Sequence, residues 1–212
     1  MATKSKKYQM QKNLRILAVL LALIVVVAVA AVVLPGLMEK KDAQLSGKHY
    51  VEIKVKDAGT ITAELDGDIA PVTVANFMKL VDEKFYDGLT FHRIISGFMI
   101  QGGDPLGNGT GGSTENIKGE FAQNGVQNPL SHVRGVLSMA RARDLNSASS
   151  QFFIVHEDAT YLDGAYAAFG KVLSGMEVVD AICAGTPVED NNGTVLKENQ
   201  PVIESIRRIE KP

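Results

Sequence analysis

Residues 91–112 read FHRIISGFMIQGGDPLGNGTGG, a stretch that passes from apolar to glycine-rich sequence. Its first half predicts two short strands, 91–95 and 98–100, that meet at a turn containing Gly97. Residues 102–119 contain seven glycines, which is too many for a helix or a strand. The stretch therefore predicts a strand pair followed by a long loop, either ordered or flexible.

Arg93 interrupts the apolar pattern of the first predicted strand. Strict alternation places it on one face with Phe91 and Ile95, and places His92 and Ile94 on the other. A guanidinium among apolar neighbours needs a hydrogen-bonding partner, because its desolvation without one is unfavourable. A functional arginine and a structural ion pair both satisfy this requirement, and the strand alone does not distinguish them.

The segments on either side predict further short strands. Apolar and charged residues alternate over 51–56, and the alternation resumes over 61–65 after a turn, which is typical of a hairpin. Apolar runs predict two more strands at 135–140 and 151–155, and a closing strand is predicted at 202–209.

Two other segments have helical spacing. Pro71 suits the first turn of a helix whose apolar residues recur at helical intervals: Val74, Phe77, Met78 and Val81. Ser174 is a candidate N-cap for a second helix that shares Met176, Val179 and Ile182 on one face. Many short strands with two separate helices predict an antiparallel β-barrel whose open ends are covered by helices.

Residues 16–34, ILAVLLALIVVVAVAAVVL, form a run of 19 residues without a polar side chain. A helix of this length reaches about 28 Å, close to the thickness of the hydrocarbon core of a bilayer. Residues 1–15 carry five basic residues and no acidic one, so the positive-inside rule places this tail in the cytoplasm. We expect a transmembrane signal anchor in the lipid bilayer at 16–34, a polar linker at 35–47, and a domain at 48–212 on the extracytoplasmic side of the cell membrane.

Two alternatives to the anchor follow from the same run. Ala28-Val29-Ala30 has the small residues of a cleavage site, and cleavage there would give a secreted protein. The run exceeds the length of about 7–15 residues that is usual for a signal peptide, which favours the uncleaved anchor. A helix that pairs within a larger assembly has less support, because the run has neither a charge nor a G-x-x-x-G pattern.

Composition narrows the classes of function. The formal net charge is −2, and without the tail it is −7, so nothing suggests a nucleic-acid partner. Cys183 is the only cysteine, which excludes an intramolecular disulfide, and its apolar neighbours predict a buried, inert thiol. The four histidines lack the spacing of metal ligands, the glycine run lacks the lysine of a P-loop, and no G-x-S-x-G elbow surrounds Ser149 or Ser150.

Three stretches together resemble the cyclophilin family: 91–112, GVLSMARA at 135–142, and SQFFIVHEDATYLDGAYAAFG at 150–170. Their order and spacing fit the family over residues 48–210. The resemblance implies an eight-stranded antiparallel β-barrel capped by two α-helices, with a substrate groove on its outer surface. It also implies a peptidyl-prolyl cis–trans isomerase that needs no cofactor or metal and binds proline-containing, unfolded or partly folded polypeptides.

The resemblance also assigns roles to matched positions. Arg93 matches the catalytic arginine, and Gln101 matches the residue that hydrogen-bonds the substrate backbone. The pocket for the proline ring is matched by Phe98, Met99, Phe153 and Leu162. The groove beside the residue that precedes proline is matched by Ala140, Arg141 and Ala142, and the groove rim by Tyr161 and Tyr166.

Four positions depart from the common family pattern. Tyr161 stands where tryptophan is frequent, and Tyr166 stands where histidine is frequent; Arg141 replaces an asparagine and Ser96 a proline. Both tyrosines keep an aromatic face at the rim, so activity is still implied, and they make the chain similar to bacterial members. Loss of the indole N–H at position 161 implies weaker binding of cyclosporin-type inhibitors.

The chemistry of the implied reaction fits these residues. An X-Pro bond crosses a barrier of about 18–20 kcal/mol because amide resonance must be broken. A fixed guanidinium can donate to the proline nitrogen as it regains a lone pair in the twisted amide. We therefore expect an isomerase that assists the folding of exported or cell-surface proteins; the alternative is a membrane-tethered chaperone or scaffold that binds proline peptides with little catalysis.

Overall fold

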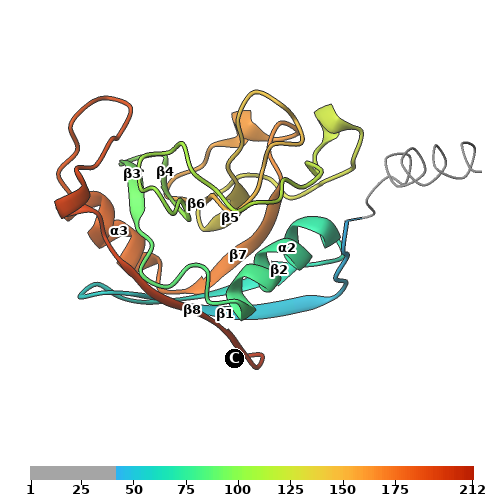
Figure 1. Ribbon diagram of the computed structural model, residues 1–212, viewed down its shortest axis with the longest axis horizontal. Helices are drawn as coiled ribbons and strands as arrows, with labels where there is room; N and C mark the ends of the chain where they lie inside the picture. Colours follow the sequence, from blue (N-terminus) through green and yellow to red (C-terminus); the bar gives the residue numbers. More distant parts are fainter. Residues whose placement is uncertain (1–41) are drawn as a thin grey trace, which may run out of the picture. The chain divides into compact units, whose positions relative to one another are not determined.

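The computed structural model describes residues 42–212 (Figure 1). The predicted basic tail, the signal anchor at 16–34 and the start of the linker lie outside the described residues. None of the helices within residues 42–212 is long and apolar enough to cross a bilayer.

Eight antiparallel strands and two α-helices make up this part of the chain. The strands are β1 Lys48–Val55, β2 Gly59–Asp66, β3 Phe91–Ile95, β4 Met99–Gly102, β5 Val136–Met139, β6 Phe152–Val155, β7 Ala168–Ser174 and β8 Ile203–Ile209. The helices are α2 Pro71–Asp82 and α3 Met176–Gly185. The order of strands across the sheet is β3-β4-β6-β5-β7-β2-β1-β8.

The sheet curls so that its edge strands β3 and β8 approach each other (Figure 1). Just before these strands, one isolated bridge joins Thr90 to Val202, and the Phe91 N–H donates to the Pro201 carbonyl at 3.0 Å. The prediction of a mainly β fold with eight antiparallel strands and two helices is confirmed, but the sheet is a curled half-barrel rather than the predicted barrel.

The centre of the core is aromatic. The ring of Phe77, on α2, lies 5.0 Å from that of Tyr86, 5.4 Å from Phe152 and 5.2 Å from Phe169, measured between centroids. Burying such rings contributes about 1.5–3 kcal/mol each. Because side chains alternate along a strand, Phe152 in this core leaves its neighbour Phe153 on the opposite face of β6.

The start of α3 corrects one prediction. Ser174 is the last residue of β7, and the residue that precedes α3 is Gly175, which makes no side-chain capping bond. Gly175 has φ +94°, and a Cβ there would lie 2.3 Å from the Thr60 carbonyl oxygen, so the turn requires glycine. The strand β7 itself was not predicted, because its sequence AFGKVLS neither alternates nor forms a continuous apolar run like those of β5 and β6.

A second correction concerns the faces of β3. The pairing of β3 with β4 shifts register between Phe91 and Arg93. Phe91 therefore packs in the main core, whereas Ile95 packs against a separate apolar cluster that contains Met99 and Phe153. Arg93 shares its face with Ile95 and not with Phe91, because an irregularity of this kind resets the alternation of side chains.

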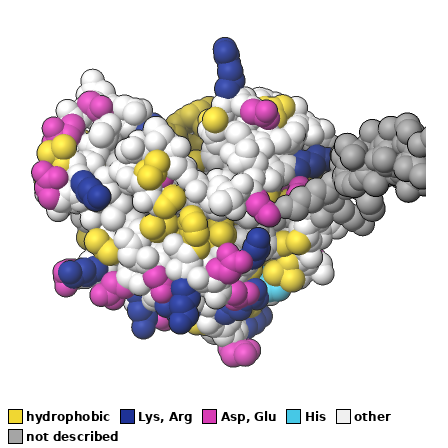
Figure 2. Space-filling model, in the orientation of Figure 1, with side chains coloured by type: hydrophobic (Ala, Val, Ile, Leu, Met, Phe, Trp, Pro, Cys, Tyr) yellow, Lys and Arg dark blue, Asp and Glu magenta, His cyan; other side chains and the backbone are white. Residues whose placement is uncertain are grey.

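Charged side chains of both signs are interspersed over the lower part of the face in Figure 2. Two arginines of β8 make paired contacts with carboxylates near α2: Arg208 Nε lies 2.6 Å from Asp82 Oδ1, and Arg207 Nη2 lies 2.6 Å from Asp87 Oδ2. Exposed pairs of this kind contribute about 0–1 kcal/mol each. These pairs connect β8 to the segment around α2 but contribute little to the free energy of unfolding.

Candidate active site

One pocket, with a volume of about 220 Å³, brings together nine of the residues that the sequence predicted for the site. They are Arg93, Phe98, Met99, Gln101, Ala140, Arg141, Phe153, Leu162 and Tyr166. Tyr161 and Ala142 do not line it. The Tyr161 ring, 72% exposed, lies over Phe98 with 5.8 Å between centroids, and Ala142 lines a neighbouring pocket.

Strand register explains why residues distant in sequence meet here. Gln101 on β4 lies opposite Arg93 on β3 and opposite Phe153 on β6. These three side chains therefore form one row across neighbouring strands, on the face opposite the main core. A cationic donor, an amide and an apolar ring are thus held side by side on regular backbone.

Arg93 is held by neutral acceptors. Its Nη1 donates to Gln101 Oε1 at 3.2 Å, its Nε to the Asn192 carbonyl at 2.8 Å and its Nη2 to Asn192 Oδ1 at 3.1 Å. These bonds contradict the structural ion pair as an interpretation of this arginine. A guanidinium has five N–H groups, so donors remain for a bound carbonyl or amide nitrogen.

Electrostatics at Arg93 follow from its partial burial. Desolvation lowers the pKa of the guanidinium, and the nearby Tyr166, Asp190 and Tyr161 oppose that shift. Arginine nevertheless stays protonated at any physiological pH. The site therefore presents a permanent, partly desolvated positive charge beside an apolar pocket.

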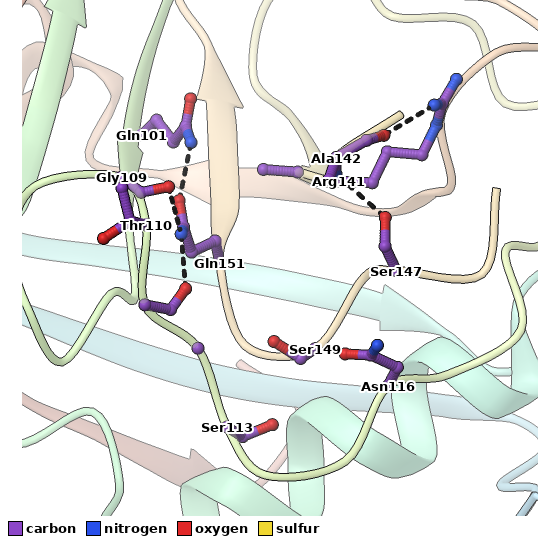
Figure 3. Close-up of a pocket in the computed structure, with 13 residues that line it drawn as sticks. Gln101, Gly109, Thr110, Ser113, Asn116, Arg141, Ala142, Ser147, Ser149 and Gln151 are labelled. Carbon is purple, nitrogen blue, oxygen red and sulfur yellow. Dashed lines mark hydrogen bonds between the residues drawn. The ribbon is translucent and has the colours of Figure 1, made fainter. Parts of the chain in front are cut away.

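Gln101 is oriented by a second glutamine that the sequence analysis did not identify. Gln101 Nε2 donates to Gln151 Oε1 at 2.8 Å, and Gln151 Nε2 donates to the carbonyls of Gly109 at 3.1 Å and Gly111 at 2.7 Å (Figure 3). This chain fixes which end of each amide faces its neighbour. The sequence signal that could have identified Gln151 is its position: it directly precedes β6 and lies two residues before Phe153, which lines the pocket.

The glycine loop is ordered by Asp104. This buried carboxylate accepts the backbone N–H groups of Leu106 at 2.8 Å, Asn108 at 3.1 Å and Gly109 at 2.6 Å. Burial raises the pKa of Asp104, but the backbone hydrogen bonds outweigh that effect and hold the pKa below its usual value. The loop carbonyls that receive Gln151 are therefore fixed in place.

Arg141 is clamped rather than free in the groove. Its Nε and Nη2 donate to the Ala165 carbonyl at 3.1 and 2.9 Å, and its Nη1 donates to the Ala142 carbonyl at 3.0 Å. Its guanidinium carbon lies 5.1 Å from the centroid of the Phe121 ring and 4.8 Å from that of Tyr166. The arginine thus connects the main core to the rim of the apolar pocket through two cation–π contacts.

A second pocket of about 350 Å³ lies beside the first and shares Gln101, Ala140 and Arg141 with it (Figure 3). The rest of its lining is Gly109, Thr110, Gly111, Gly112, Ser113, Asn116, Ala142, Ser147, Ser149 and Gln151. Its wall is polar, whereas the first pocket is lined mainly by apolar side chains. Because the two pockets share Gln101, Ala140 and Arg141, they adjoin each other.

A hydrogen-bond chain that runs from the exposed Asp163 to the buried His132 and Ser138 lies behind Phe153 in the first pocket. His132 Nδ1 lies 2.8 Å from Asp163 Oδ1, and its Nε2 lies 2.9 Å from Ser138 Oγ. The order matches that of a hydrolase triad, but Ser138 is 0% exposed, so no substrate can reach it. The imidazole instead stacks on Phe153, with 6.1 Å between centroids and 18° between planes.

The other nucleophiles considered from the sequence have structural surroundings. Ser150 Oγ donates to the Gly103 carbonyl at 2.8 Å and accepts from the Ser113 N–H at 3.1 Å. Cys183 is half-buried rather than fully buried, and burial raises the pKa of its thiol to about 11. The thiol is therefore protonated at neutral pH, as predicted for an inert cysteine.

A family model described as cyclophilin type peptidyl-prolyl cis-trans isomerase/CLD matches residues 50–208. Peptidyl-prolyl cis-trans isomerase B of Bacillus subtilis is 48% identical over 144 residues, covering 68% of this chain and 92% of that protein.

Two crystal structures of a cyclophilin type peptidyl-prolyl cis-trans isomerase from Cryptosporidium parvum are also similar, each with 31% identity. One has a TM-score of 0.69 and covers 78% of this chain and 100% of that one. The other, determined in the presence of the dipeptide Ala-Pro, has a TM-score of 0.67 and covers 76% of this chain and 99% of that one.

Proposed function

Because the chain belongs to the cyclophilin family of peptidyl-prolyl cis–trans isomerases, we propose that it accelerates X-Pro isomerisation in exported or cell-surface proteins and so assists their folding. The observation that carries the site assignment is the row of Arg93, Gln101 and Phe153 across β3, β4 and β6. This row sets a cationic donor and an amide beside an apolar floor.

In the proposed mechanism the proline ring enters the apolar pocket, whose walls are Phe98, Met99, Phe153 and Leu162. The use of Ala-Pro with the related Cryptosporidium parvum protein supports a proline-containing ligand. Burial of the ring in a pocket of about 220 Å³ fixes the proline side of the peptide bond. Rotation of the bond then requires only the preceding carbonyl to move.

Arg93 and Gln101 act on the peptide bond itself. The Gln101 amide hydrogen-bonds the substrate backbone, and a free N–H of Arg93 donates to the proline nitrogen as it becomes pyramidal. This bond is stronger in the twisted transition state than in either planar ground state, so it lowers the barrier. A reduction of about 6–8 kcal/mol corresponds to roughly four to six powers of ten in rate.

The activity test uses the full-length chain in detergent and a peptide with one X-Pro bond. We expect the cis–trans exchange rate, measured by NMR at equilibrium, to rise in proportion to protein concentration. Binding of the peptide without any increase in exchange rate would contradict the enzyme and favour the alternative of a tethered chaperone or scaffold.

We also propose that the domain is held outside the cytoplasm by the apolar run at 16–34. The support is the 19-residue apolar stretch, which follows a tail with five basic residues and no acidic one. Protease added to intact cells should cut the domain away, and the cell-bound remnant should contain residue 1. Protection in intact cells but not in opened cells would reverse the orientation, and a mature chain starting near Ala31 would indicate a cleaved signal peptide.

A further inference from the structure

The guanidinium of Arg93 is held from a loop that the sequence analysis did not connect with the site. Two of its three hydrogen bonds to oxygen go to Asn192, one to the backbone carbonyl and one to the side chain. The third goes to Gln101, on the neighbouring strand. Asn192 lies in the exposed loop that follows α3, 99 residues further along the chain.

The loop that carries Asn192 is itself fixed. Asp190 accepts the Thr194 N–H and hydroxyl, each at 3.0 Å, and the Gly193 N–H donates to the Asp190 carbonyl at 3.0 Å. Gly193 has φ +78°, and a Cβ there would lie 2.2 Å from the Ile94 carbonyl oxygen, so only glycine fits. Residues 190–194 therefore form one tight turn.

This turn is docked on the strand that bears the arginine. The Ile94 N–H donates to the Gly193 carbonyl at 2.8 Å, and the Val195 N–H donates to the His92 carbonyl at 3.1 Å. The two backbone bonds flank Arg93 on β3. Any shift of the turn relative to β3 would break both, so Asn192 stays in register with the guanidinium.

The arrangement matters because an arginine side chain is intrinsically mobile. Ordering such a side chain costs about 1.5–2 kcal/mol of conformational entropy, and donation to a transition state is effective only from a preorganised donor. One bond to Gln101 leaves the guanidinium plane free to rotate about the Nη1 contact. Bonds from Nε and Nη2 to Asn192 fix that plane from the opposite side.

The chemical nature of the acceptor also matters. An amide oxygen and a backbone carbonyl are neutral, so they orient the guanidinium without pairing its charge. A carboxylate at the same place would form a bidentate pair and draw the positive charge away from the peptide bond. We propose that Asn192 is a positioning residue that presents Arg93 to the X-Pro bond with its charge unpaired, an inference that rests on the proposed function.

The test compares Asn192→Ala and Asn192→Asp with Asn191→Ala in the full-length chain. Asn191 is an exposed asparagine one position away, and no side-chain hydrogen bond of it is found over residues 42–212, so it is a matched control. We expect Asn192→Ala to lower kcat about tenfold, the effect of one hydrogen bond to a charged group, with KM nearly unchanged. Asn192→Asp should keep the geometry yet fail to restore kcat, whereas Asn191→Ala should behave as wild type.

Two further measurements separate positioning from general stability. In an Arg93→Ala background, Asn192→Ala should have no additional effect on kcat, because there is no guanidinium left to orient. The Arg93 Nη2 N–H NMR signals should broaden in Asn192→Ala, which removes the acceptor of Nη2, and stay sharp in Asn191→Ala. A tenfold loss in both backgrounds, or an Asn192→Ala variant equal to the control, would overturn the proposal. The NMR comparison needs no turnover, so it remains decisive even for a chain without isomerase activity.

Discussion

Arg93 and Gln101 lie opposite each other on β3 and β4, and Nη1 of the arginine donates to Oε1 of the glutamine at 3.2 Å. The glutamine is fixed in turn, because its Nε2 donates to Gln151 Oε1, and Gln151 Nε2 donates to the Gly111 carbonyl in the glycine loop. The charged donor is thus oriented by a chain of neutral amides. Its removal should affect the reaction far more than the fold.

Arg93→Ala should lower kcat/KM by a factor of tens to hundreds, a loss of about 2–4 kcal/mol of transition-state stabilisation. The melting temperature should change little, since the acceptors that hold Arg93 include an exposed loop residue, Asn192, which water can reach. Exchange NMR on an X-Pro peptide and thermal unfolding check both parts. Wild-type activity in this variant would refute the mechanism.

Arg141→Lys should weaken peptide binding by loosening the pocket rim. Lysine has no planar guanidinium that could stack on the rings of Phe121 and Tyr166. Its ammonium also cannot reproduce the geometry with which Arg141 donates to the carbonyls of Ala142 and Ala165. We expect KM to rise about three- to tenfold, equivalent to the roughly 0.5–1 kcal/mol or more of a partly exposed cation–π contact together with a lost hydrogen bond. Arg143→Lys, at an exposed position two residues away, is the matched control and should leave KM unchanged.

Cyclosporin should bind at least tenfold more weakly to this chain than to a family member with tryptophan at the position of Tyr161. The Tyr161 ring lies over Phe98, but a phenol hydroxyl projects from a different point than an indole N–H. An unpaired acceptor on the inhibitor costs about 1–3 kcal/mol. Calorimetric titration should show that Tyr161→Trp recovers part of the affinity, with peptide turnover mostly preserved. Low-nanomolar binding by the native chain would show that this rim position is not decisive.

Stability should fall as the pH drops below about 6.5, the pKa of an unperturbed histidine. His92 is buried, and neither of its ring nitrogens has a hydrogen-bond partner among residues 42–212. Burial lowers its pKa; the charge of Asp104 opposes this shift and that of Arg93 adds to it. A histidine with a depressed pKa in the folded state favours unfolding once the unfolded chain binds its proton, and the loss continues down to the folded pKa.

The variant that checks this is His92→Phe, which removes the titrating group and fills its space with an apolar ring. Its melting temperature should vary less between pH 7 and pH 5 than that of the wild type. At pH 8 His92 is neutral in both the folded and the unfolded wild-type chain, so its titration does not affect stability there. An unchanged pH dependence would assign the acid loss of stability to other groups, such as His132, whose pKa is likewise lowered by burial against the opposing effect of Asp163.

Sequence patterns predicted the strands that alternate and missed what depends on close packing. The hairpin of β1 and β2 was predicted because Val51, Ile53 and Val55 are buried in alternation. The strand β7, AFGKVLS, has neither this alternation nor the continuous apolar run that predicted β5 and β6. The N-cap prediction at Ser174 failed because the backbone of β2 approaches the turn closely enough to require Gly175.

At the site, resemblance located the residues that line the groove and missed those that orient them. Gln151 and Asn192 are ordinary polar residues in sequence, and their importance arises only from register across strands and from a turn docked on β3. Their partners lie 50 and 99 residues away. No local pattern contains such pairings, because they are properties of the folded sheet.

The burial of Asp104 has a consequence for anions. A glycine-rich segment that gathers several backbone N–H groups around one negative charge is the arrangement with which nucleotide-binding loops receive a phosphate. In this chain the negative charge is supplied internally, by the carboxylate that accepts from Leu106, Asn108 and Gly109. These N–H groups are already paired with a carboxylate, so we expect inorganic phosphate and nucleotides not to bind to this loop.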